Sequence, residues 1–551
     1  MDQLPILIVG AGPSGLVLAL ILLKCGVPVR IVDKETTHRL GSRGAAIQPR
    51  TLELYKILGV LPDILKAGEP LPSSMAKYEH GKTDPSMFVK VHEILEPTPD
   101  IPYPNTYNVS QAKQEEVLRS HLLRFSCTVE LGSELRSLEQ FPDHVVAHIE
   151  KTDTEGNIVE ETASFAWLVG TDGAHSVVRK QVGVEYVGET RAQYIAIGDV
   201  VVEQGLDSKF WHMWDQSPKS IIFRPSGGKD SSFMFLYTGR SEELADKTIT
   251  REEFVNRFYE ITGRQDIKFG AATWLSNYRP NIRMVKQMQV GRVLLAGDAA
   301  HCHSPTGGQG LNSGVHDAMN LGWKLALVHQ GRASPTLLAT YEEERLRVIA
   351  HMLEFTTQLH DSSLHRLYDG KQITHESWKR NGDIQMLGVN YSGSSIILQD
   401  AEAVADILTP YSRPVGTGSV GVQAAYRAPD ASGLVSVEEQ QITLFSVFGV
   451  VAHTVLIFGS EASCKADATE LVARLPTGVA RAVRILPQGE SAAGSSSCDL
   501  ILEDGAGHAY RGYGVSTDNL TAVVVRPDGV VGAVVSDVDG VERYFGNFCR
   551  V

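Results

Sequence analysis

The sequence has few cysteines, no long apolar run near its start and no excess of positive charge. Its six cysteines form no C-x-x-C pair and have no metal-ligand spacing, which argues against a disulfide framework and a zinc site. The apolar run Leu16–Leu23 ends at Lys24 and is too short to span a bilayer. The net charge of −14 disfavours nucleic acid as a partner, because an acidic chain repels phosphate backbones. We therefore expect a cytoplasmic protein without a signal peptide, a membrane span or a bound metal.

The order of apolar runs and turns predicts an α/β fold that is interrupted by a β-rich insertion. Residues 6–33 read as strand, glycine turn, helix and strand, which is a βαβ unit. Short β-rich runs in residues 191–279 predict a mainly antiparallel sheet. A strand at Val290–Ala296 and two long helical patterns then return to the α/β pattern. The first domain is therefore predicted to be discontinuous, with residues 1–190 and 280–370.

The rest of the chain predicts a linker and a third domain. Residues 371–440 are rich in loop signals, as expected for a linker or a wrapping segment. Strand and helix patterns return over residues 441–551, a length typical of a domain. The predicted elements include a strand at Thr443–Val447, a helix near Ala468–Leu475 and a hairpin whose turn is Arg526–Gly529.

A glycine-rich turn, Gly10–Gly15 (GAGPSG), lies between the first strand and the first helix. Gly10 permits the tight turn, Gly12 lets a pyrophosphate approach the backbone, and Gly15 lets the helix pack closely on the strand. The helix N-terminus then offers unpaired N–H groups to the phosphates. Asp33 ends the second strand, where an acid hydrogen-bonds a ribose hydroxyl, so the site suits FAD or NAD rather than NADP. The predicted dinucleotide contacts are Gly10, Gly12, Pro13, Ser14, Gly15, Asp33 and Lys34.

Three further segments resemble motifs of the single-component flavoprotein aromatic hydroxylases. Gly170–Arg179 (GTDGAHSVVR) resembles their D-G motif, and Gly297–His301 (GDAAH) resembles their G-D motif. Ser304–Asn312 (SPTGGQGLN) looks like their flavin-covering loop, and Tyr341–Arg345 matches the helix that usually follows. The similarity covers the order and spacing of motifs over residues 5–350.

The resemblance implies that FAD is the bound cofactor and that these motifs contact it. Asp298 would accept a hydrogen bond from a ribityl hydroxyl of FAD, the alternative being an acid that caps the next helix. The loop glycines would bring backbone N–H groups and the helix dipole close to the isoalloxazine ring. Asp172 and Arg179 would serve both FAD and the nicotinamide donor, with a structural turn role open for Asp172. For Arg43 and Gln111, a solvated arginine and a polar cap are the alternatives. The implied contacts are Arg43, Gln111, Asp172, Arg179, Asp298, Pro305, Gly308, Gly310, Leu311 and Asn312.

The resemblance also implies the reaction. Only one nucleotide fingerprint is visible, so NADPH or NADH is expected to dock transiently, reduce the flavin and leave. Reduced flavin would react with O2 to give a C4a-hydroperoxide, which would hydroxylate an electron-rich phenolic or hydroxybenzoate-type ring in a dry site. Some phenol hydroxylases carry an aspartate near the residue that Arg43 resembles. Ala45 and Ala46 stand in that stretch here, which argues against simple phenol as the substrate.

Two residues are predicted to contact the substrate. Tyr278 would be its hydrogen-bond partner and His212 a proton relay; a tyrosine in the interface between lobes and a structural histidine are the alternatives. The aromatic residues of the β-rich insertion are equally compatible with a pocket wall and with a sheet core. They are Trp211, Trp214, Phe223, Phe233, Phe235 and Tyr237.

Three other functions stay open. The same oxidant would support oxidative decarboxylation of a 4-hydroxybenzoate derivative, with Arg224, Arg279 or Arg283 as the carboxylate partner. The second is a tailoring oxygenase that acts on a larger aromatic compound or polyketide. The third is a flavin-binding protein without oxygenase activity, against which the loop at residues 305–312 argues.

The C-terminal part resembles the thioredoxin-like domain of phenol hydroxylases and their relatives, with Tyr426–Asp430 ahead of it. Without a C-x-x-C pair it is unable to perform dithiol chemistry, so a packing or homodimer role is expected. The predicted fold class is α/β: a Rossmann-like FAD-binding domain with an inserted, mainly antiparallel β-sheet substrate domain, and a C-terminal thioredoxin-like domain.

Overall fold

The computed structural model covers the whole chain. The residues it describes are 3–152, 155–192, 194–216, 219–227, 231–239, 249–304, 306–362, 382–398, 410–411, 421–460, 470–471, 473–490 and 498–550. No helix within these ranges is long and apolar enough to cross a membrane.

A six-stranded sheet with the order β20-β21-β12-β1-β2-β8 carries the glycine-rich turn. All of its neighbouring strands are parallel except β20 and β21. Its most buried strands are continuous apolar runs, as expected for strands that are covered on both faces. The predicted single strand at Val290–Ala296 is instead split into β20 and β21, because the chain turns at Gly291 with a φ of +59°. The strands are β1 (Ile6–Val9), β2 (Val29–Val32), β8 (Val129–Glu130), β12 (Trp167–Gly170), β20 (Gln289–Val290) and β21 (Val293–Leu295).

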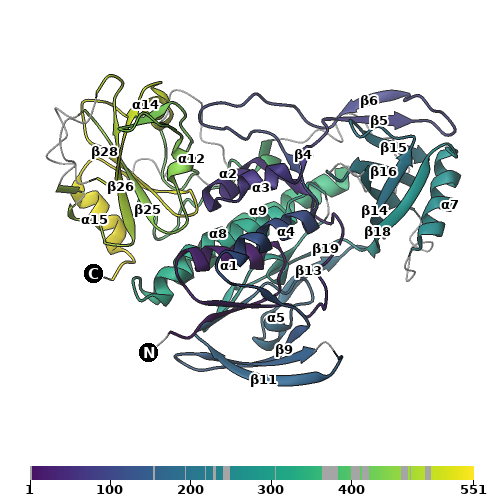
Figure 1. Cartoon of the computed structure of the whole chain (residues 1–551), viewed down its shortest axis with the longest axis horizontal. Coiled ribbons are helices and arrows are strands. Elements are labelled where there is room, and N and C mark those ends of the chain that lie inside the picture. Colours follow the sequence, from purple (N-terminus) through teal and green to yellow (C-terminus); the bar gives the residue numbers. More distant parts are fainter. Residues whose placement is uncertain are drawn as a thin grey trace.

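Helices form a central layer beside this sheet (Figure 1). Helix α1 begins at Pro13, which suits the first helical turn, and the chain leaves it at Gly26 with a φ of +75°. It packs closely on α8, since a Cβ on Gly322 would lie 2.6 Å from Ile21. The helices here are α1 (Pro13–Lys24), α2 (Pro49–Leu58), α3 (Leu61–Lys66), α4 (Gln111–Leu123), α5 (Val177–Gln181), α8 (Gly310–His329) and α9 (Ala339–Ser362), with 3-10 turns η1 (Gly297–Ala299) and η2 (Pro335–Leu338).

Three small sheets complete this part of the molecule. One has the order β11-β10-β9 and lies at the bottom of Figure 1; the others have the orders β13-β19-β22 and β3-β7-β4. Their strands are β3 (Ala46–Ile47), β4 (Glu69–Pro70), β7 (Tyr107–Asn108), β9 (Ser133–Gln140), β10 (Val145–Thr152), β11 (Ile158–Phe165), β13 (Tyr186–Thr190), β19 (Asn281–Val285) and β22 (His301–Cys302).

A seven-stranded sheet with the order β18-β14-β17-β16-β15-β5-β6 stands at the right of Figure 1. Its neighbours are antiparallel except β15 and β5. Two of its strands come from residues 74–90, outside the predicted range of 191–279. Helix α7 covers one face, where Phe254 stacks on Phe235 with ring centroids 4.1 Å apart. The elements are β5 (Ser74–Tyr78), β6 (Met87–Lys90), β14 (Ile195–Gln204), β15 (Trp211–Gln216), β16 (Lys219–Pro225), β17 (Ser232–Thr238), β18 (Lys268–Tyr278) and α7 (Arg251–Thr262).

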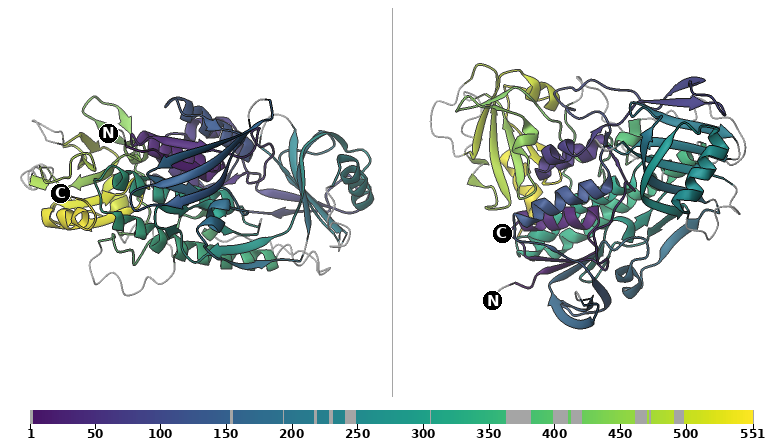
Figure 2. Two further views of the ribbon diagram at one scale, coloured as in Figure 1. Left: turned by 90° about the horizontal axis from the view of Figure 1, so that it is seen from below. Right: turned by 45° about the vertical axis from the view of Figure 1, so that its right-hand side comes forward.

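A second seven-stranded sheet, with the order β24-β23-β27-β26-β25-β28-β29, is formed by the C-terminal part. It lies on the opposite side of the helices from the first one in both views of Figure 2. The predicted strand at Thr443–Val447 is wrong: Thr443 precedes helix α12 (Leu444–Val447). The predicted helix near residues 468–475 lies partly outside the described residues. The other elements are β23 (Leu434–Ser436), β24 (Gln441–Ile442), β25 (His453–Phe458), β26 (Ala480–Leu486), β27 (Leu500–Asp504), β28 (Thr521–Val525), β29 (Val531–Val535), α14 (His508–Tyr513), α15 (Val538–Gly546) and the 3-10 turn η3 (Gly382–Gln385).

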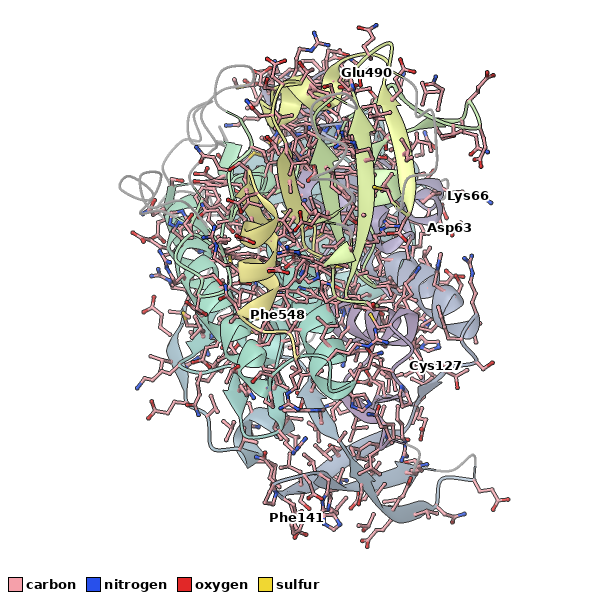
Figure 3. The ribbon with its side chains drawn as sticks, turned by 90° about the vertical axis from the view of Figure 1, so that its left-hand side faces the viewer. Asp63, Lys66, Cys127, Phe141, Glu490 and Phe548 are labelled. Atoms are coloured by element: carbon pink, nitrogen blue, oxygen red, sulfur yellow. The ribbon has the colours of Figure 1, made fainter. Side chains whose placement is uncertain are left out.

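The C-terminal sheet is packed directly on the long helices. Phe548, which follows α15, is buried and lies against Trp323 of α8, with ring centroids 6.1 Å apart. Figure 3 shows this residue at the lower end of the C-terminal helix, where it meets the green helices. The sheet and the helices therefore share one apolar interface. The division into domains along the predicted boundaries stays a prediction.

Candidate functional site

Two cavities lie end to end between the elements that carry the motifs. The large cavity has a volume of about 540 Å³ and is bounded by the first seven-stranded sheet and by the loop before α8. The small cavity, of about 160 Å³, lies at the ends of β1, β2 and β12. Five residues line both of them, so they join into one elongated site. These are Arg39, Gln111, Asp298, Gly310 and Leu311.

The glycine-rich turn forms one wall of the small cavity. Gly10 has a φ of +104°, and a Cβ there would lie 2.5 Å from the Thr171 carbonyl oxygen. A Cβ on Gly12 would meet nothing within 4 Å, so its backbone is open to a ligand. Gly15 lines neither cavity, but a Cβ there would lie 2.2 Å from the Gly10 carbonyl oxygen. Each glycine therefore has the steric surroundings that a pyrophosphate-binding turn requires. Pro13 and Ser14 also line the small cavity.

Asp33 supports this turn from the end of β2. Its Oδ2 accepts a hydrogen bond from the Ala11 N–H at 2.8 Å, and its Oδ1 accepts one from the Glu35 N–H at 3.0 Å. Asp33 and Lys34 both line the small cavity. The carboxylate thus shapes the glycine turn and also lies where a ribose hydroxyl of a dinucleotide would be expected.

Asp298 lies where the two cavities meet. Its side chain is exposed toward the cavities, and no group among the described residues donates a hydrogen bond to its carboxylate. The turn that carries it is fixed from α8, because Asp317 Oδ2 accepts hydrogen bonds from the Gly297 N–H at 2.9 Å and from His301 Nε2 at 2.6 Å. A rigidly held acceptor of this kind suits a hydroxyl of the cofactor.

The loop before α8 turns its backbone toward the large cavity. Gly307 and Gly308 have φ values of +90° and +61°, and they line this cavity together with Gly310 and Leu311. Helix α8 begins at Gly310 and has 20 residues, so its unpaired N–H groups and positive end face both cavities. Asn312 lines neither cavity; its side chain donates to the carbonyl of Gly308 at 2.6 Å and fixes the loop. Pro305 lies outside the described residues.

The side chains of the D-G motif mostly form hydrogen bonds with other groups of the protein. The Asp172 carboxylate accepts hydrogen bonds from the Ser176 hydroxyl at 2.6 Å and the Val177 N–H at 2.7 Å, and so caps α5, although the residue also lines the small cavity. Arg179 lines neither cavity. It donates to the carbonyls of Ala299 and Ala174, at 2.8 Å each. Through Arg179 the motif connects α5 to the turn at residues 297–299. The arginine side chain does not reach either cavity.

Gln111 lies at the junction, and Arg43 lines the large cavity beside it. Arg43 has a φ of +34° and places its guanidinium carbon 5.2 Å from the centroid of the Trp274 ring. Gln111 accepts a hydrogen bond from the Gly44 N–H at 3.3 Å and lines both cavities. These contacts hold the Arg43 loop against the large cavity.

The structure separates the two predicted substrate residues. Tyr278 lines the large cavity and donates its hydroxyl hydrogen to the His303 carbonyl at 3.1 Å; burial raises its pKa. His212 is 1% exposed and lines neither cavity. Its Nδ1 pairs with the Tyr78 hydroxyl at 2.9 Å and its Nε2 with the Asp207 carbonyl at 2.8 Å. His212 therefore does not reach the cavity, and its contacts agree with the structural alternative rather than with a proton relay.

The two faces of the first seven-stranded sheet explain which aromatic residues reach the cavity. Along β17, Phe233 and Tyr237 belong to the core under α7, whereas Met234 and Leu236 line the large cavity. This is the alternation that a strand imposes. Of the other aromatic residues of this sheet, Trp211 lines the cavity, whereas Trp214 and Phe223 belong to the core. Phe235 shares the face of Phe233 and Tyr237 and stacks on Phe254 of α7, although it also borders the cavity.

Arg224 is a half-buried cation in the wall of the large cavity, with its guanidinium carbon 5.6 Å from the centroid of the Trp211 ring. Its Nε has no hydrogen-bond partner among the described residues, and its Nη2 meets only the Met234 sulfur at 3.1 Å. Burial lowers its pKa to about 10, against the opposing effect of Asp199. Arg279 and Arg283, the other predicted carboxylate partners, do not line this cavity. A guanidinium whose Nε has no hydrogen-bond partner among the described residues can bind an anion.

Sequence reasoning missed several lining residues. Arg39 lines both cavities, and Trp274 and Ile384 line the large one. Arg39 and Trp274 belong to no motif. Ile384 belongs to residues 371–440, the predicted linker. It is distant in sequence from the loop before α8 beside which it lies, so no local sequence pattern indicates that it lines the cavity.

Comparison with known proteins agrees with this geometry. Residues 3–356 match the family described as FAD binding domain, and residues 497–551 match the family described as phenol hydroxylase, C-terminal dimerisation domain. The chain belongs to the FAD-dependent aromatic monooxygenases. This confirms the predicted family, the enzyme class and the bound FAD; the likeness of the C-terminal part to thioredoxin stays a prediction.

Three similar proteins illustrate the relationship. A flavin-dependent monooxygenase of Mycobacteroides abscessus is 34% identical over 468 residues, covering 84% of this chain and 90% of the relative. Pentachlorophenol 4-monooxygenase of Sphingobium chlorophenolicum is 28% identical over 539 residues, covering 96% and 93%. The solved complex of aklavinone-11 hydroxylase with FAD and aklavinone has a TM-score of 0.77 at 22% identity and covers 99% of each chain, which shows the shared fold.

Proposed function

We propose that this enzyme hydroxylates a phenolic or hydroxybenzoate-type aromatic compound, using O2 and electrons from NADPH or NADH. The observation that carries the proposal is the junction of the two cavities at Asp298 and the N-terminus of α8. There, the small cavity lined by the glycine-rich turn meets the large cavity lined by the first seven-stranded sheet. When bound, FAD supplies the electron transfer and the oxygen activation.

The residues present fit FAD. The open backbone at Gly12 and the start of α1 would hold the pyrophosphate, and Asp33 a ribose hydroxyl. Asp298, which has no donor among the described residues, would accept the hydrogen bond of a ribityl hydroxyl. The N–H groups at Gly310 and Leu311 would stabilise negative charge at the ring edge.

The walls of the large cavity would exclude water and orient the substrate. Ile222, Met234 and Leu236 offer apolar surface on the sheet side. The Tyr278 hydroxyl already donates to a carbonyl, so its oxygen is left to accept a hydrogen bond from a substrate hydroxyl. Such a bond would direct the ring and increase electron density at the positions ortho and para to that hydroxyl.

Arg224 favours a substrate that carries a carboxylate over a neutral phenol. A half-buried guanidinium whose Nε has no hydrogen-bond partner among the described residues would be stabilised by a charge-assisted hydrogen bond to an anion. The same observation supports oxidative decarboxylation of a 4-hydroxybenzoate derivative as the second candidate function. Carbon dioxide released in proportion to NAD(P)H consumed would identify this second reaction.

A homodimer is part of the proposal. It is supported by the match of residues 497–551 to a family described as a dimerisation domain. Sedimentation of the FAD-loaded protein should give twice the mass of one chain, and a monomer at micromolar concentration would contradict it.

The test of the proposed reaction is a screen of phenols and hydroxybenzoates on the FAD-loaded protein. We expect at least one compound to stimulate O2-dependent oxidation of NADPH or NADH and to gain a hydroxyl group by mass spectrometry. A yellow protein that no compound stimulates would favour a flavoprotein without oxygenase activity.

A further inference from the structure

Residues 382–398, called the strap below, bring a distant part of the chain to the large cavity. The strap begins with η3, and Ile384 within it lines the cavity while being 8% exposed. Every other described residue that lines this cavity lies at or before Leu311. Among the described residues, Ile384 is therefore the contribution of the chain after α8 to this wall.

Hydrogen bonds fix Ile384 between two loops of the cavity. Gln309 Nε2 donates to the carbonyls of Ile384 and Gly307, at 3.0 and 3.1 Å. Gln385 Nε2 donates to the Pro104 carbonyl at 3.1 Å, close to Thr106 of the cavity wall. The isoleucine side chain consequently lies beside the loop that precedes α8, where a Cβ on Gly307 would be 3.8 Å from its Cδ1.

The backbone next to Ile384 adopts a conformation that its surroundings impose. Met386 is fully buried with a φ of +60°, which is unfavourable for a residue with a side chain. Its N–H donates to the Asp383 carbonyl at 3.0 Å and closes the turn. A strained, buried turn persists only where the neighbouring contacts determine it, so the position of Ile384 is well defined.

The other end of the strap is attached to the C-terminal part of the molecule. The Leu398 N–H donates to the Gly532 carbonyl of β29 at 2.9 Å, and the Tyr391 N–H donates to the Ala425 carbonyl at 3.0 Å. Ser394 donates its hydroxyl hydrogen to Glu344 of α9 at 2.7 Å. The C-terminal sheet and α9 therefore hold the strap that carries the cavity wall.

We infer that Ile384 is a specificity-determining residue that limits the size of the aromatic ring system beside the flavin loop, and that the C-terminal sheet holds it there through the strap. The inference rests on the proposed function. A close apolar wall discriminates strongly, because one methylene more or less in such a pocket changes discrimination by roughly 10- to 200-fold.

The experiment compares Ile384→Ala, Ile384→Phe and a control, Ile396→Ala, in the FAD-loaded protein. Ile396 is 3% exposed in the same strap but does not line the cavity, so its truncation removes packing alone. The probes are 4-hydroxybenzoate and the larger 6-hydroxy-2-naphthoate. Dissociation constants come from titrations of the flavin absorbance, and kcat/KM from stimulated NAD(P)H oxidation.

Ile384→Ala should raise the preference for the naphthoate over the benzoate by about 10-fold in both measurements, and Ile384→Phe should lower it. Ile396→Ala should leave the ratio as in the wild type. Unchanged ratios in both Ile384 variants, with a wild type that turns over either probe, would overturn the inference and leave the proposed function standing. A wild type that binds both probes without turnover would overturn the proposed function, and the binding ratios would still decide the role of Ile384. Binding of neither probe would overturn both.

Discussion

Arg526 donates hydrogen bonds to both carboxylate oxygens of Glu344, at 2.7 and 2.8 Å, and neither side chain is exposed. The arginine precedes the turn between β28 and β29, and the glutamate lies on α9. Lys324 of α8 donates to the same carboxylate at 2.7 Å. A buried cluster of charges thereby joins the C-terminal hairpin to the two long helices. Within it, Glu344 also accepts a hydrogen bond from the Ser394 hydroxyl of the strap.

Replacing Glu344 by glutamine should strongly destabilise the protein. Arg526 also pairs with Asp528, so the substitution leaves two buried cations, Lys324 and Arg526, with a single carboxylate. Removing one partner from a buried pair typically costs about 3–5 kcal/mol. The free energy of unfolding in urea measures the effect, with Glu354→Gln on the exposed side of the same helix as the control. A loss below about 1 kcal/mol would contradict the role given to this cluster.

The same pair should make stability depend on pH. Burial alone would raise the pKa of Glu344, but Arg526 and Lys324 hold it well below its usual range. As the pH falls, Glu344 therefore takes up a proton in the unfolded chain before it does so in the folded one. The stability that its ionised carboxylate contributes is fully present at neutral pH. It is lost as the pH falls below about 4.3, the usual glutamate value. The difference in unfolding free energy between wild type and Glu344→Gln should shrink by about 1.4 kcal/mol per pH unit below that value. A constant difference down to pH 3 would be inconsistent with this account.

Replacing Tyr278 by phenylalanine should lower kcat/KM for a phenolic substrate by about 10-fold, as expected for the loss of one hydrogen bond worth about 1.4 kcal/mol. Binding of FAD should change little, because the hydroxyl contacts the His303 carbonyl and faces the large cavity. Tyr259→Phe is the matched control, since its hydroxyl also donates to a carbonyl at 3.1 Å but does not line the cavity. Equal losses in both variants would assign Tyr278 a structural role.

Replacing Arg224 by glutamine should weaken binding of an anionic substrate selectively. A hydrogen bond to a charged group is worth about 1.5–3 kcal/mol, so KM for 4-hydroxybenzoate should rise about 10- to 100-fold. The neutral 4-hydroxybenzamide should be much less affected, and Arg279→Gln, outside the cavity wall, should change neither. Parallel losses for the two compounds would remove the argument for a carboxylate.

The FAD-binding half of the site was accessible from the sequence because its constraints are local. Gly10, Gly12 and Asp33 lie within one βαβ unit, and each glycine is required by a contact or an open backbone that the motif itself defines. The loop before α8 is equally local. Arg179 is the exception: its position in the motif suggested a ligand contact, whereas the fold turns it toward backbone carbonyls.

The large cavity depends on contacts between distant segments. Residues 74–90 add β5 and β6 to a sheet otherwise built from residues 195–278, and Ile384 arrives from the strap; no local period encodes either arrangement. The sequence does not indicate whether His212 or Tyr278 reaches the large cavity. The fold decides this, because the two side chains lie on different faces of the sheet. Over so few residues, periodicity does not distinguish a buried strand from one helical turn. The prediction of a strand at Thr443–Val447 is wrong for this reason.

The most direct test of the proposed function is to run the reaction of the FAD-loaded enzyme under 18O-labelled dioxygen with the hydroxybenzoate that best stimulates NAD(P)H oxidation. The account predicts a hydroxylated product that carries one labelled oxygen atom, with one NAD(P)H oxidised per product formed. A product that takes its new oxygen from water, or NAD(P)H oxidation that yields only hydrogen peroxide with every compound tested, would contradict it.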